Sequence, residues 1–444
     1  MIEQLPSGWA WASVDEVAEV QGGIQKQPKR HPVANHFPFL RVANVFRGRL
    51  DLANVHEIEL FEGELTRLAL RAGDLLVVEG NGSPNEIGRA ALWHGELDPC
   101  VHQNHLIRVR PASGLEPRYL AALWNSSIVA EELRTIASST SGLLGLSTRK
   151  VKAVRMPIAP IGEQRRIVAT IDEQFSRLDN AGRQIESGLR RLPLIRRAVL
   201  GRVMPDLLPA GWKVLTVEEA GTVDLGRQRS PKYHTGPNMK PYLRVANVHE
   251  DRIDLSDVKE MDFPPEQLAR HELRPGDILL NEGQSPEFVG RPAMYRGELP
   301  GVCFTNSLIR FRPFDFVDGE YALLVFLRHL RFGCSQREAQ ITTNIAHMAA
   351  GRFKRVEFPV PPLDEQREIV LEVRRQLSLL GAFETALRVA LKRSETLRRA
   401  ILAAAFRGEL VPQDPSDEPA SELLARIAAE RPVPTARARK KNGA

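Results

Sequence analysis

Residues 38–45 read Pro-Phe-Leu-Arg-Val-Ala-Asn-Val, and residues 241–248 read Pro-Tyr-Leu-Arg-Val-Ala-Asn-Val. The two octapeptides lie 203 residues apart, and Leu-Pro-Ser-Gly-Trp at 5–9 returns at the same distance as Leu-Pro-Ala-Gly-Trp. After one deletion the distance becomes 202, as in the Glu-Gln-Arg tripeptides that begin at Glu163 and Glu365. Because many blocks agree with a single indel, the chain is predicted to be an internal duplication.

The composition is that of an ordinary globular protein. The 444 residues are 43% hydrophobic and 26% charged, and this length predicts several domains. No apolar run reaches the ~18 residues of a membrane helix, and the N-terminus lacks the basic and apolar regions of a signal peptide. Three isolated cysteines argue against a disulfide framework and a zinc knuckle. We therefore expect a cytoplasmic protein without a membrane partner.

The charge balance points weakly to a polyanionic partner. The chain carries 61 basic and 55 acidic residues, a net charge of +6, and 49 of the basic residues are arginine. Arginine is favoured where phosphate or guanine is recognised by paired hydrogen bonds. GC-rich codon usage produces the same excess, so composition leaves both explanations open.

Each repeat contains two unlike parts. In the first part, short apolar runs at 74–79, 105–109, 277–281 and 307–311 alternate with Gly- and Pro-rich turns, and a helix is expected at 117–125. This pattern predicts two similar mixed α/β (α+β) domains, at 1–156 and 206–358. In the second part, at 157–205 and 359–411, apolar residues recur every three and four positions, which is the heptad pattern of a coiled coil.

The two long helices are expected to follow Pro160 and Pro362, with acidic residues in their first turns. Each would run about 40 residues, or ~60 Å at 1.5 Å per residue, which exceeds the diameter of one small domain. We therefore expect them to form an antiparallel coiled coil that joins the two domains with pseudo-two-fold symmetry. The segment 412–444 is expected to be a partly disordered tail that includes a short helix at 420–430.

Three pairs of equivalent loops are candidates for contacting DNA. The first loop pair (21–30 and 225–232) is rich in Arg, Lys and Gln and has no acidic residue. The second loop pair (80–85 and 283–287) follows a predicted strand, and the third (102–105 and 305–307) precedes one. Arg pairs with guanine and Gln or Asn with adenine in the major groove, and Ser and Lys add phosphate contacts. The predicted DNA-binding residues are Gln25, Lys26, Gln27, Lys29, Arg30, Asn81, Ser83, His102, Gln103, Arg227, Gln228, Arg229, Ser230, Lys232, Gln284, Ser285 and Thr305.

Other interpretations of these loops stay open: a solvated surface loop for the first pair, a simple turn for the second, and internal polar residues for the third. In the octapeptides, Leu, Val and Ala alternate as in a strand, so Arg41, Asn44, Arg244 and Asn247 are predicted to be structural or to make backbone contacts. Two domains that read different sequences need different contacting residues, and these positions are identical.

The combination of features resembles the specificity subunit of type I restriction–modification systems. The resemblance rests on two variable domains, long helices that open Pro-Ile-Gly-Glu-Gln-Arg (160–165) and Pro-Leu-Asp-Glu-Gln-Arg (362–367), and a Gly-Ser-Pro…Gly-Arg turn. A further match is Phe-Arg-Gly-Glu-Leu-Val-Pro-Gln at 406–413. The family implies a non-catalytic subunit whose two target-recognition domains each read half of a bipartite, asymmetric site on double-stranded DNA, while the helices set the spacer.

The resemblance also implies partners. Two methyltransferase subunits, which methylate adenine at N6, would dock on the helices and on the flanks 141–155 and 344–355, and motor–nuclease subunits would join them. S-adenosylmethionine, ATP and Mg²⁺ are expected on those partners, and this chain is expected to bind no cofactor or metal. The sequence contains no Asn/Asp-Pro-Pro-Tyr/Phe motif and no GxxxxGK[ST] loop.

Two alternatives are a stand-alone DNA-binding regulator and an orphan nuclease or modification enzyme. The nuclease interpretation depends on the acid pairs Asp74/Glu79 and Asp277/Glu282, which also fit the two ends of a short structural strand.

Overall fold

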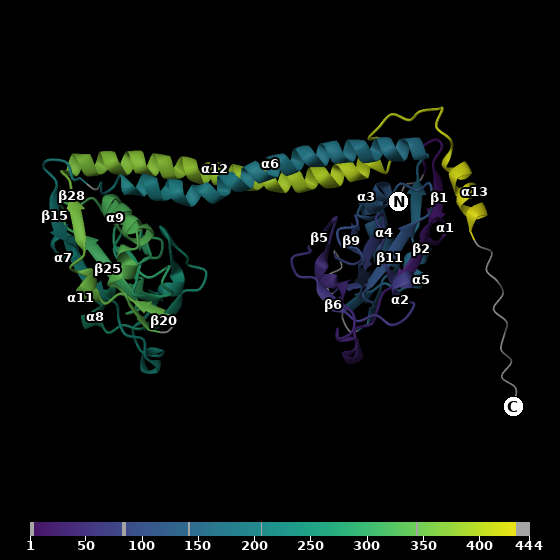
Figure 1. The fold of residues 1–444 in the computed structure, drawn as a ribbon. Coiled ribbons are helices and arrows are strands. Elements are labelled where there is room, and N and C mark those ends of the chain that lie inside the picture. Colours follow the sequence, from purple (N-terminus) through teal and green to yellow (C-terminus); the bar gives the residue numbers. More distant parts are fainter. Residues whose placement is uncertain (1–3, 82–85, 141–142, 206, 343–344, 432–444) are drawn as a thin grey trace. The chain divides into compact units, whose positions relative to one another are not determined.

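The computed structural model describes residues 4–81, 86–140, 143–205, 207–342 and 345–431. The chain divides into two compact units, one made of residues 1–184 and 390–444 and the other of residues 185–389. Each unit contains one α/β domain and segments of both long helices (Figure 1).

The first domain is built from short strands that alternate with short helices. Its strands are β1 (Ala10–Ser13), β2 (Ala18–Gly22), β3 (Phe37–Leu40), β4 (Val45–Phe46), β5 (Arg49–Leu50), β6 (His56–Ile58), β7 (Leu75–Val78), β8 (Gly80–Asn81), β9 (Ala90–Leu92), β10 (Val101–His102), β11 (Leu106–Pro111), β12 (Ser138–Thr140), β13 (Leu143–Gly145) and β14 (Arg155–Ile158). Its helices are α1 (Val14–Val17), α2 (Glu64–Leu68), α3 (Pro117–Trp124), α4 (Ser127–Ile136) and α5 (Thr148–Ala153), with 3-10 turns η1 (Pro28–Arg30) and η2 (Val42–Asn44).

The second domain repeats these elements in order. Its strands are β15 (Lys213–Thr216), β16 (Gly221–Leu225), β17 (Met239–Leu243), β18 (Val248–His249), β19 (Arg252–Ile253), β20 (Lys259–Asp262), β21 (Ile278–Asn281), β22 (Gly283–Gln284), β23 (Pro292–Met294), β24 (Cys303–Phe304), β25 (Leu308–Pro313), β26 (Gln340–Thr342), β27 (Ile345–His347) and β28 (Glu357–Val360). Its helices are α7 (Val217–Ala220), α8 (Pro265–His271), α9 (Gly319–Arg331), α10 (Cys334–Glu338) and α11 (Ala350–Phe353), with 3-10 turns η3 (Pro231–Tyr233) and η4 (Val245–Asn247).

A four-stranded antiparallel sheet forms the centre of each domain, in the order β2-β11-β7-β9 and, equivalently, β16-β25-β21-β23. The central strands β7 and β21 are buried on both faces, and their residues are apolar except for Asn281 at the end of β21. A smaller sheet, β10-β3-β6 or β24-β17-β20, contains one parallel pair of strands. The matching strand orders confirm the duplication at the level of topology.

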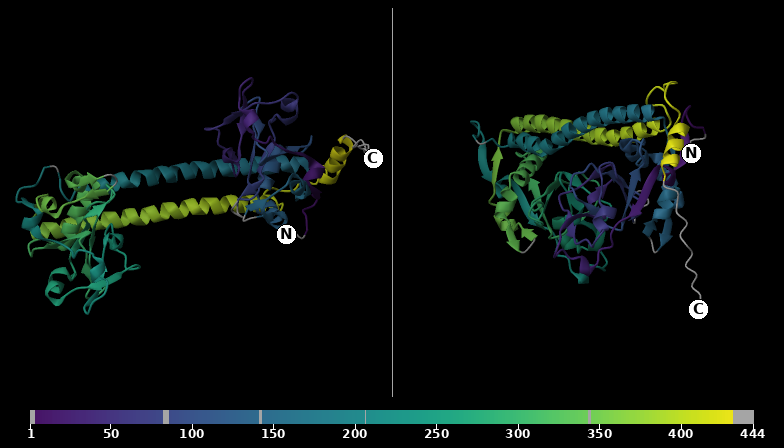
Figure 2. Two further views of the ribbon diagram at one scale, coloured as in Figure 1. Left: turned by 90° about the horizontal axis from the view of Figure 1, so that it is seen from below. Right: turned by 45° about the vertical axis from the view of Figure 1, so that its right-hand side comes forward.

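The long helices are α6 (Ile161–Gly201) and α12 (Leu363–Ala405), which begin directly after the predicted prolines. In the first unit, Val168 and Ile171 of α6 share a core with Ile401 and Ala405, near the end of α12. In the second unit the relation is reversed, because Leu200 near the end of α6 shares a core with Val373 near the start of α12. Within each unit the two helices are therefore antiparallel, and Figure 2 shows their segments side by side.

Two arginines that interrupt the apolar heptad pattern, Arg196 and Arg398, form ion pairs between the helices. Arg196 donates to Glu384 at 2.8 Å in the second unit, and Arg398, at the equivalent position, pairs with Asp179 in the first. Arg398 also lies over the Phe175 ring, with its guanidinium carbon 4.8 Å from the ring centroid.

The repeated octapeptide does not continue as a strand, contrary to the alternation of its apolar residues. Strand β3 ends at Leu40, and η2 follows because the Asn44 side chain accepts a hydrogen bond from the Arg41 backbone N–H at 2.9 Å. The buried Asn44 amide also donates to the carbonyls of Asp51 and Asn54, at 2.9 and 3.0 Å. Asn247 makes the same three kinds of contact in the second domain. The structural role predicted for both asparagines is confirmed.

The described part of the C-terminal tail packs against the first unit. Helix α13 (Ala420–Glu430) buries Ala420, Leu423 and Ile427 in the core of that unit, because these residues recur at helical spacing. Asp417, just before the helix, pairs with Arg166 of α6 at 2.6 Å. The predicted short helix is thus present, and through its apolar face residues 420–430 belong to the fold; residues 432–444 lie outside the described part of the chain.

Among the described residues, no helix has both the length and the apolar character needed to cross a membrane.

Candidate nucleic-acid interface

In the first domain, the first and third loops lie against each other. The Ile24 N–H donates to the carbonyl of His102 at 2.8 Å, and the Asn104 N–H donates to the carbonyl of Ile24 at 2.9 Å. These bonds form a parallel bridge between Ile24 and Gln103. The second domain repeats the arrangement, with Arg227 bridged to Thr305.

The second loop joins this cluster through one glutamate in each domain. The Glu79 N–H donates to the His105 carbonyl at 2.9 Å, and the Glu79 carbonyl accepts from the Leu146 N–H at 2.7 Å. Glu282 makes the equivalent bonds with Ser307 and Met348. The backbones of Glu79 and Glu282, which directly precede the second loop, therefore tie the start of that loop to the third loop in each domain.

The first loop of the first domain presents several of its predicted side chains to solvent. Gln25, Lys26 and Lys29 are exposed, and Gln27 and Gln103 are half-buried. Exposed amides and ammonium groups can bond to base edges and phosphates without first breaking internal contacts.

Arg30 is engaged within the domain. Its two terminal nitrogens donate to the Glu64 carboxylate at 2.8 and 2.9 Å, and its guanidinium carbon lies 4.4 Å from the Phe61 ring centroid. The hydrogen bonds from Arg30 lower the pKa of Glu64 to about 2. In this structure Arg30 anchors the loop to α2.

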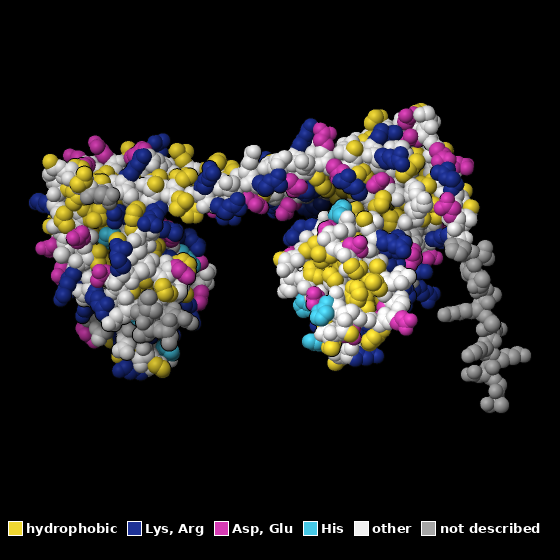
Figure 3. Space-filling model, in the orientation of Figure 1, with side chains coloured by type: hydrophobic (Ala, Val, Ile, Leu, Met, Phe, Trp, Pro, Cys, Tyr) yellow, Lys and Arg dark blue, Asp and Glu magenta, His cyan; other side chains and the backbone are white. Residues whose placement is uncertain are grey.

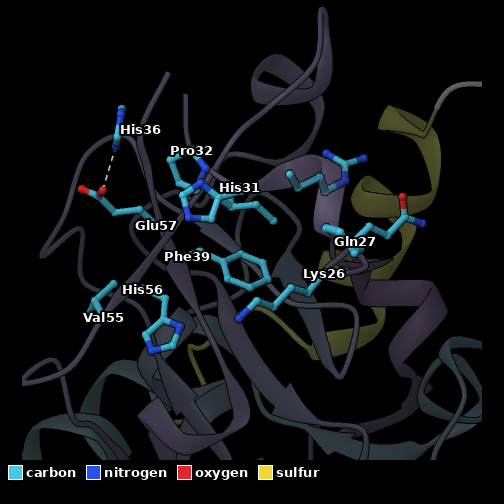
Figure 4. Close-up of a pocket in the computed structure, with 12 residues that line it drawn as sticks. Lys26, Gln27, His31, Pro32, His36, Phe39, Val55, His56 and Glu57 are labelled. Carbon is cyan, nitrogen blue, oxygen red and sulfur yellow. Dashed lines mark hydrogen bonds and ion pairs between the residues drawn. The ribbon is translucent and has the colours of Figure 1, made fainter. Parts of the chain in front are cut away.

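Beside this loop lies a cavity of about 800 Å³. Figure 4 shows Lys26, His31, His56 and Phe39 around it, and Figure 3 shows histidines gathered on the surface of the first domain. His36 contacts Glu57 at 2.9 Å at its edge. Burial, with help from the charges of Arg41 and Lys26, lowers the pKa of His56. The accessible lining therefore combines cations and imidazoles, which can contact nucleotides, whereas the Phe39 ring is buried.

In the second domain, the exposed members of the first loop are Gln228, Arg229 and Lys232, and Ser230 is half-buried. Lys232 lies over the ring of Tyr233, with its nitrogen 4.8 Å from the centroid. Arg227, in contrast, is buried.

His102 and Thr305, from the third loop pair, have no exposed surface. Burial lowers the pKa of His102 to about 3, so the ring is neutral. The Thr305 hydroxyl contacts the Ser307 hydroxyl at 3.0 Å and the Leu243 carbonyl at 3.3 Å. In this structure neither side chain is available to a ligand.

The second loop pair is attached to hairpins. Strand β8 pairs with β13, and β22 pairs with β27. The backbone of Asn81 lies in β8, but its side chain and the whole of Ser83 lie outside the described residues. Gln284 and Ser285 are half-buried, and the Ser285 N–H donates to the Gln284 side-chain oxygen at 3.1 Å.

The predicted acid pairs have structural partners. Arg110 donates two hydrogen bonds, of 2.6 and 2.7 Å, to the buried Asp74 carboxylate. Arg312 holds Asp277 in the same way. Within the described ranges, no group of three His, Cys, Asp or Glu residues is placed to hold a metal ion. Asp74 and Glu79 directly flank β7, and Asp277 and Glu282 directly flank β21, so these acids lie at the two ends of a short strand, as the structural interpretation predicts.

Several residues at the site were not singled out from the sequence. His31, His36, His56 and Phe61 lie beside the first loop of the first domain. Tyr233, Phe263, Gln267, Arg270 and His271 lie beside that of the second. Among these residues, Tyr233 follows Lys232 directly in the sequence, and an aromatic residue next to a cation is a pattern that could have indicated a nucleic-acid contact.

Comparisons with known proteins agree on one family. Residues 209–373 match the family model described as the type I restriction modification DNA specificity domain. The type I restriction enzyme EcoKI specificity subunit of Escherichia coli K12 is 24% identical over 96% of both chains. The EcoAI specificity subunit of Escherichia coli is 31% identical over 55% of both.

Solved structures show the same fold. A chain from a study of complex assembly and conformational transition of the type I R-M system has a TM-score of 0.71 and 22% identity, covering 92% of this chain and 100% of that one. The HsdS subunit from Thermoanaerobacter tengcongensis has a TM-score of 0.63 and 23% identity, covering 92% of this chain and 98% of that one.

Proposed function

Because the chain belongs to the specificity subunits of type I restriction–modification systems, we propose that each domain reads one half of a bipartite, asymmetric DNA site. The proposal is supported by one observation: the framework contacts are the same in the two domains, whereas the loop residues differ. Asn44 and Asn247 make the same contacts in the two domains. At the equivalent bridge positions, however, one domain has Ile24 and the other has Arg227. A shared framework with different loop residues is what two readers of different sequences require.

The exposed loop residues supply the contacts. Lys26, Arg229 and Lys232 suit phosphates or guanine, and the amides of Gln25 and Gln228 suit adenine. The imidazole groups around the cavity beside Lys26 add surfaces for close approach to DNA.

The long helices set the unspecified spacer and bind partner subunits in this proposal. Helix α12 exposes Leu371, Leu379 and Phe383, which follow one another at multiples of four residues and so lie along one ridge. Exposed apolar side chains in such a row are typical of interaction surfaces. We propose that two methyltransferase subunits dock on the helices and on the described flanks 143–155 and 345–355, and that motor–nuclease subunits join the complex.

The chain itself is proposed to be non-catalytic, with S-adenosylmethionine, ATP and Mg²⁺ held by the partners. Support comes from the acids that were candidates for a nuclease centre, because Asp74 and Asp277 are each neutralised by a two-point arginine contact.

Mapping N6-methyladenine across the host genome, with and without the gene for this chain, tests the proposal. We expect a bipartite motif that disappears on deletion. Replacing residues 1–156 by the domain of another family member should then change only one half of the motif. An unchanged methylome, or a change in both halves, would overturn the proposal.

A further inference from the structure

Arg227 is a buried cation of the second domain whose side chain keeps unused hydrogen-bond donors. Its side chain is only 6% exposed, and its Nε and Nη1 atoms are buried without a hydrogen-bond partner. Its backbone is fixed by bonds to Phe304 and Asn306, at 3.1 and 3.0 Å. A buried guanidinium with unused donors is costly, because desolvation is not compensated.

Two aromatic rings hold the guanidinium. Its carbon lies 3.9 Å from the centroid of Tyr233 and 5.4 Å from that of Phe263. Stacking of this kind favours the cation and restricts the side chain to one orientation. Lys232 and Arg227 together lower the pKa of Tyr233. Aromatic rings therefore contact the faces of the guanidinium, but two of its nitrogen atoms, Nε and Nη1, have no hydrogen-bond acceptor.

The neighbouring arginines already have a carboxylate, whereas Arg227 does not. Arg310 donates to Asp224 at 2.6 Å, and Arg270 lies 3.6 Å from the same carboxylate. In the portion of the chain covered by the structure, no carboxylate oxygen lies within 4.0 Å of the Arg227 guanidinium.

Arg227 lines an open cavity of about 300 Å³. The lining contains no acidic residue: Leu225, Gly226, Arg227, Gln228, Tyr233, Gln267, Arg270 and His271. Because every charged group of this lining is basic, the cavity favours a ligand that brings hydrogen-bond acceptors.

We propose that Arg227 reads a guanine in the half-site of the second domain, donating to its O6 and N7 acceptors. This inference rests on the proposed function and deepens it, because it names one base class and the domain that reads it. A backbone phosphate offers acceptors too, but phosphate contacts do not depend on sequence and would be needed in both domains. The first domain has Ile24 at this position, at the equivalent bridge. An apolar residue there excludes a shared phosphate contact and fits a base contact that differs between half-sites.

The test uses the full chain in complex with its methyltransferase subunits and a duplex that carries the motif obtained from the methylome. Each guanine of the second half-site is replaced in turn by 7-deazaguanine, which lacks the N7 acceptor. For the wild type, we expect one such position to weaken binding strongly. Arg227→Met should lower affinity for the unmodified duplex roughly ten- to a hundred-fold, and the same 7-deazaguanine should then have no further effect.

Two variants serve as controls. Arg227→Lys keeps the positive charge but loses the paired N–H donors of the guanidinium. It should therefore retain non-specific DNA binding and no longer discriminate guanine from 7-deazaguanine. Arg252→Met removes an exposed arginine of the same unit that pairs with Asp254, and it should leave the discrimination unchanged. Recognition of the first half-site reports whether each variant is folded.

Three results would overturn the inference. The second half-site could contain no guanine on either strand. Arg227→Met could weaken all duplexes equally, which would assign the residue to a phosphate. The 7-deazaguanine effect could persist in Arg227→Met. In each case the domain exchange tests the proposed function separately. If the exchange still alters one half-site, the proposed function holds and only the role of Arg227 is refuted.

Discussion

An ion pair between domain and helix occurs in both units with its charges reversed. In the first unit, Arg118 at the start of α3 pairs with Asp172 of α6 at 2.6 Å. In the second unit, Glu320 at the start of α9 pairs with Arg374 of α12. The positions are equivalent, because the neighbouring Tyr119 and Tyr321 hydroxyls donate to the Pro157 and Pro359 carbonyls in the same way.

Reversing one charge in the first unit should destabilise the contact, and reversing both should restore it. The side chains of Arg118 and Asp172 are 54% and 43% exposed, so the pair contributes about 0.2–1 kcal/mol. Arg118→Glu replaces that attraction by repulsion and should cost about 1 kcal/mol. Asp172→Arg should cost a similar amount, and the double variant should regain most of the loss.

The second unit gives a similar expected effect. Arg374 also contacts Asp251, and all three side chains are about one third exposed or less. Arg374→Ala leaves Arg296, at 3.2 Å from Asp251 and 3.0 Å from Glu320, as the remaining partner of the two carboxylates, and should cost about 1 kcal/mol after allowance for solvent screening.

Hydrogen exchange of the full chain, followed at the peptides that contain α3 and α9, measures each unit separately. Arg118→Glu should increase exchange at α3 only, and Arg374→Ala should increase exchange at α9 only. If the double variant Arg118→Glu/Asp172→Arg exchanges as fast as the sum of the single variants predicts, the two charges are not coupled and the reasoning is wrong.

Two further predictions concern buried polar groups. Burial raises the pKa of Glu163, which accepts a hydrogen bond from the Trp9 indole at 2.9 Å. The folded state therefore binds the proton more tightly than the unfolded state, and this residue should lower stability as pH rises above about 4.5 through the folded pKa. Glu163→Gln should remove that loss, and denaturant unfolding at pH 5 and pH 7 checks it; an unchanged pH dependence would contradict the assignment. Asn44→Ala removes three hydrogen bonds of a buried side chain and should cost about 2–3 kcal/mol. Asn247→Ala removes the equivalent bonds in the second domain, so it serves as the comparison and should cost the same within about 1 kcal/mol.

Much of the architecture follows from the sequence because it depends on local patterns. The apolar runs of β7 and β21 specify buried strands, and the heptads after Pro160 and Pro362 specify the long helices. The repeat shows that the same topology occurs twice. Identical residues in both copies, such as Asn44 and Asn247, could be assigned to the framework because two different readers would not share them.

The site depended on contacts that no local pattern encodes. Sequence composition placed Arg30, His102, Arg227 and Thr305 among similar polar loop residues. Their different environments arise from partners far along the chain: Glu64 for Arg30, and the parallel pairing of β3 with β10 for the burial of His102.

What the sequence determined by itself is therefore the duplication, its strands and helices, and the loops that vary between the copies. What only the tertiary structure decided is which loop side chains are free to meet a ligand. Exposure and pairing are set by long-range packing, because a guanidinium in a loop can be solvated, paired as in Arg30, or stacked without a carboxylate as in Arg227. The sequence around each residue is compatible with all three states, and the fold selects one.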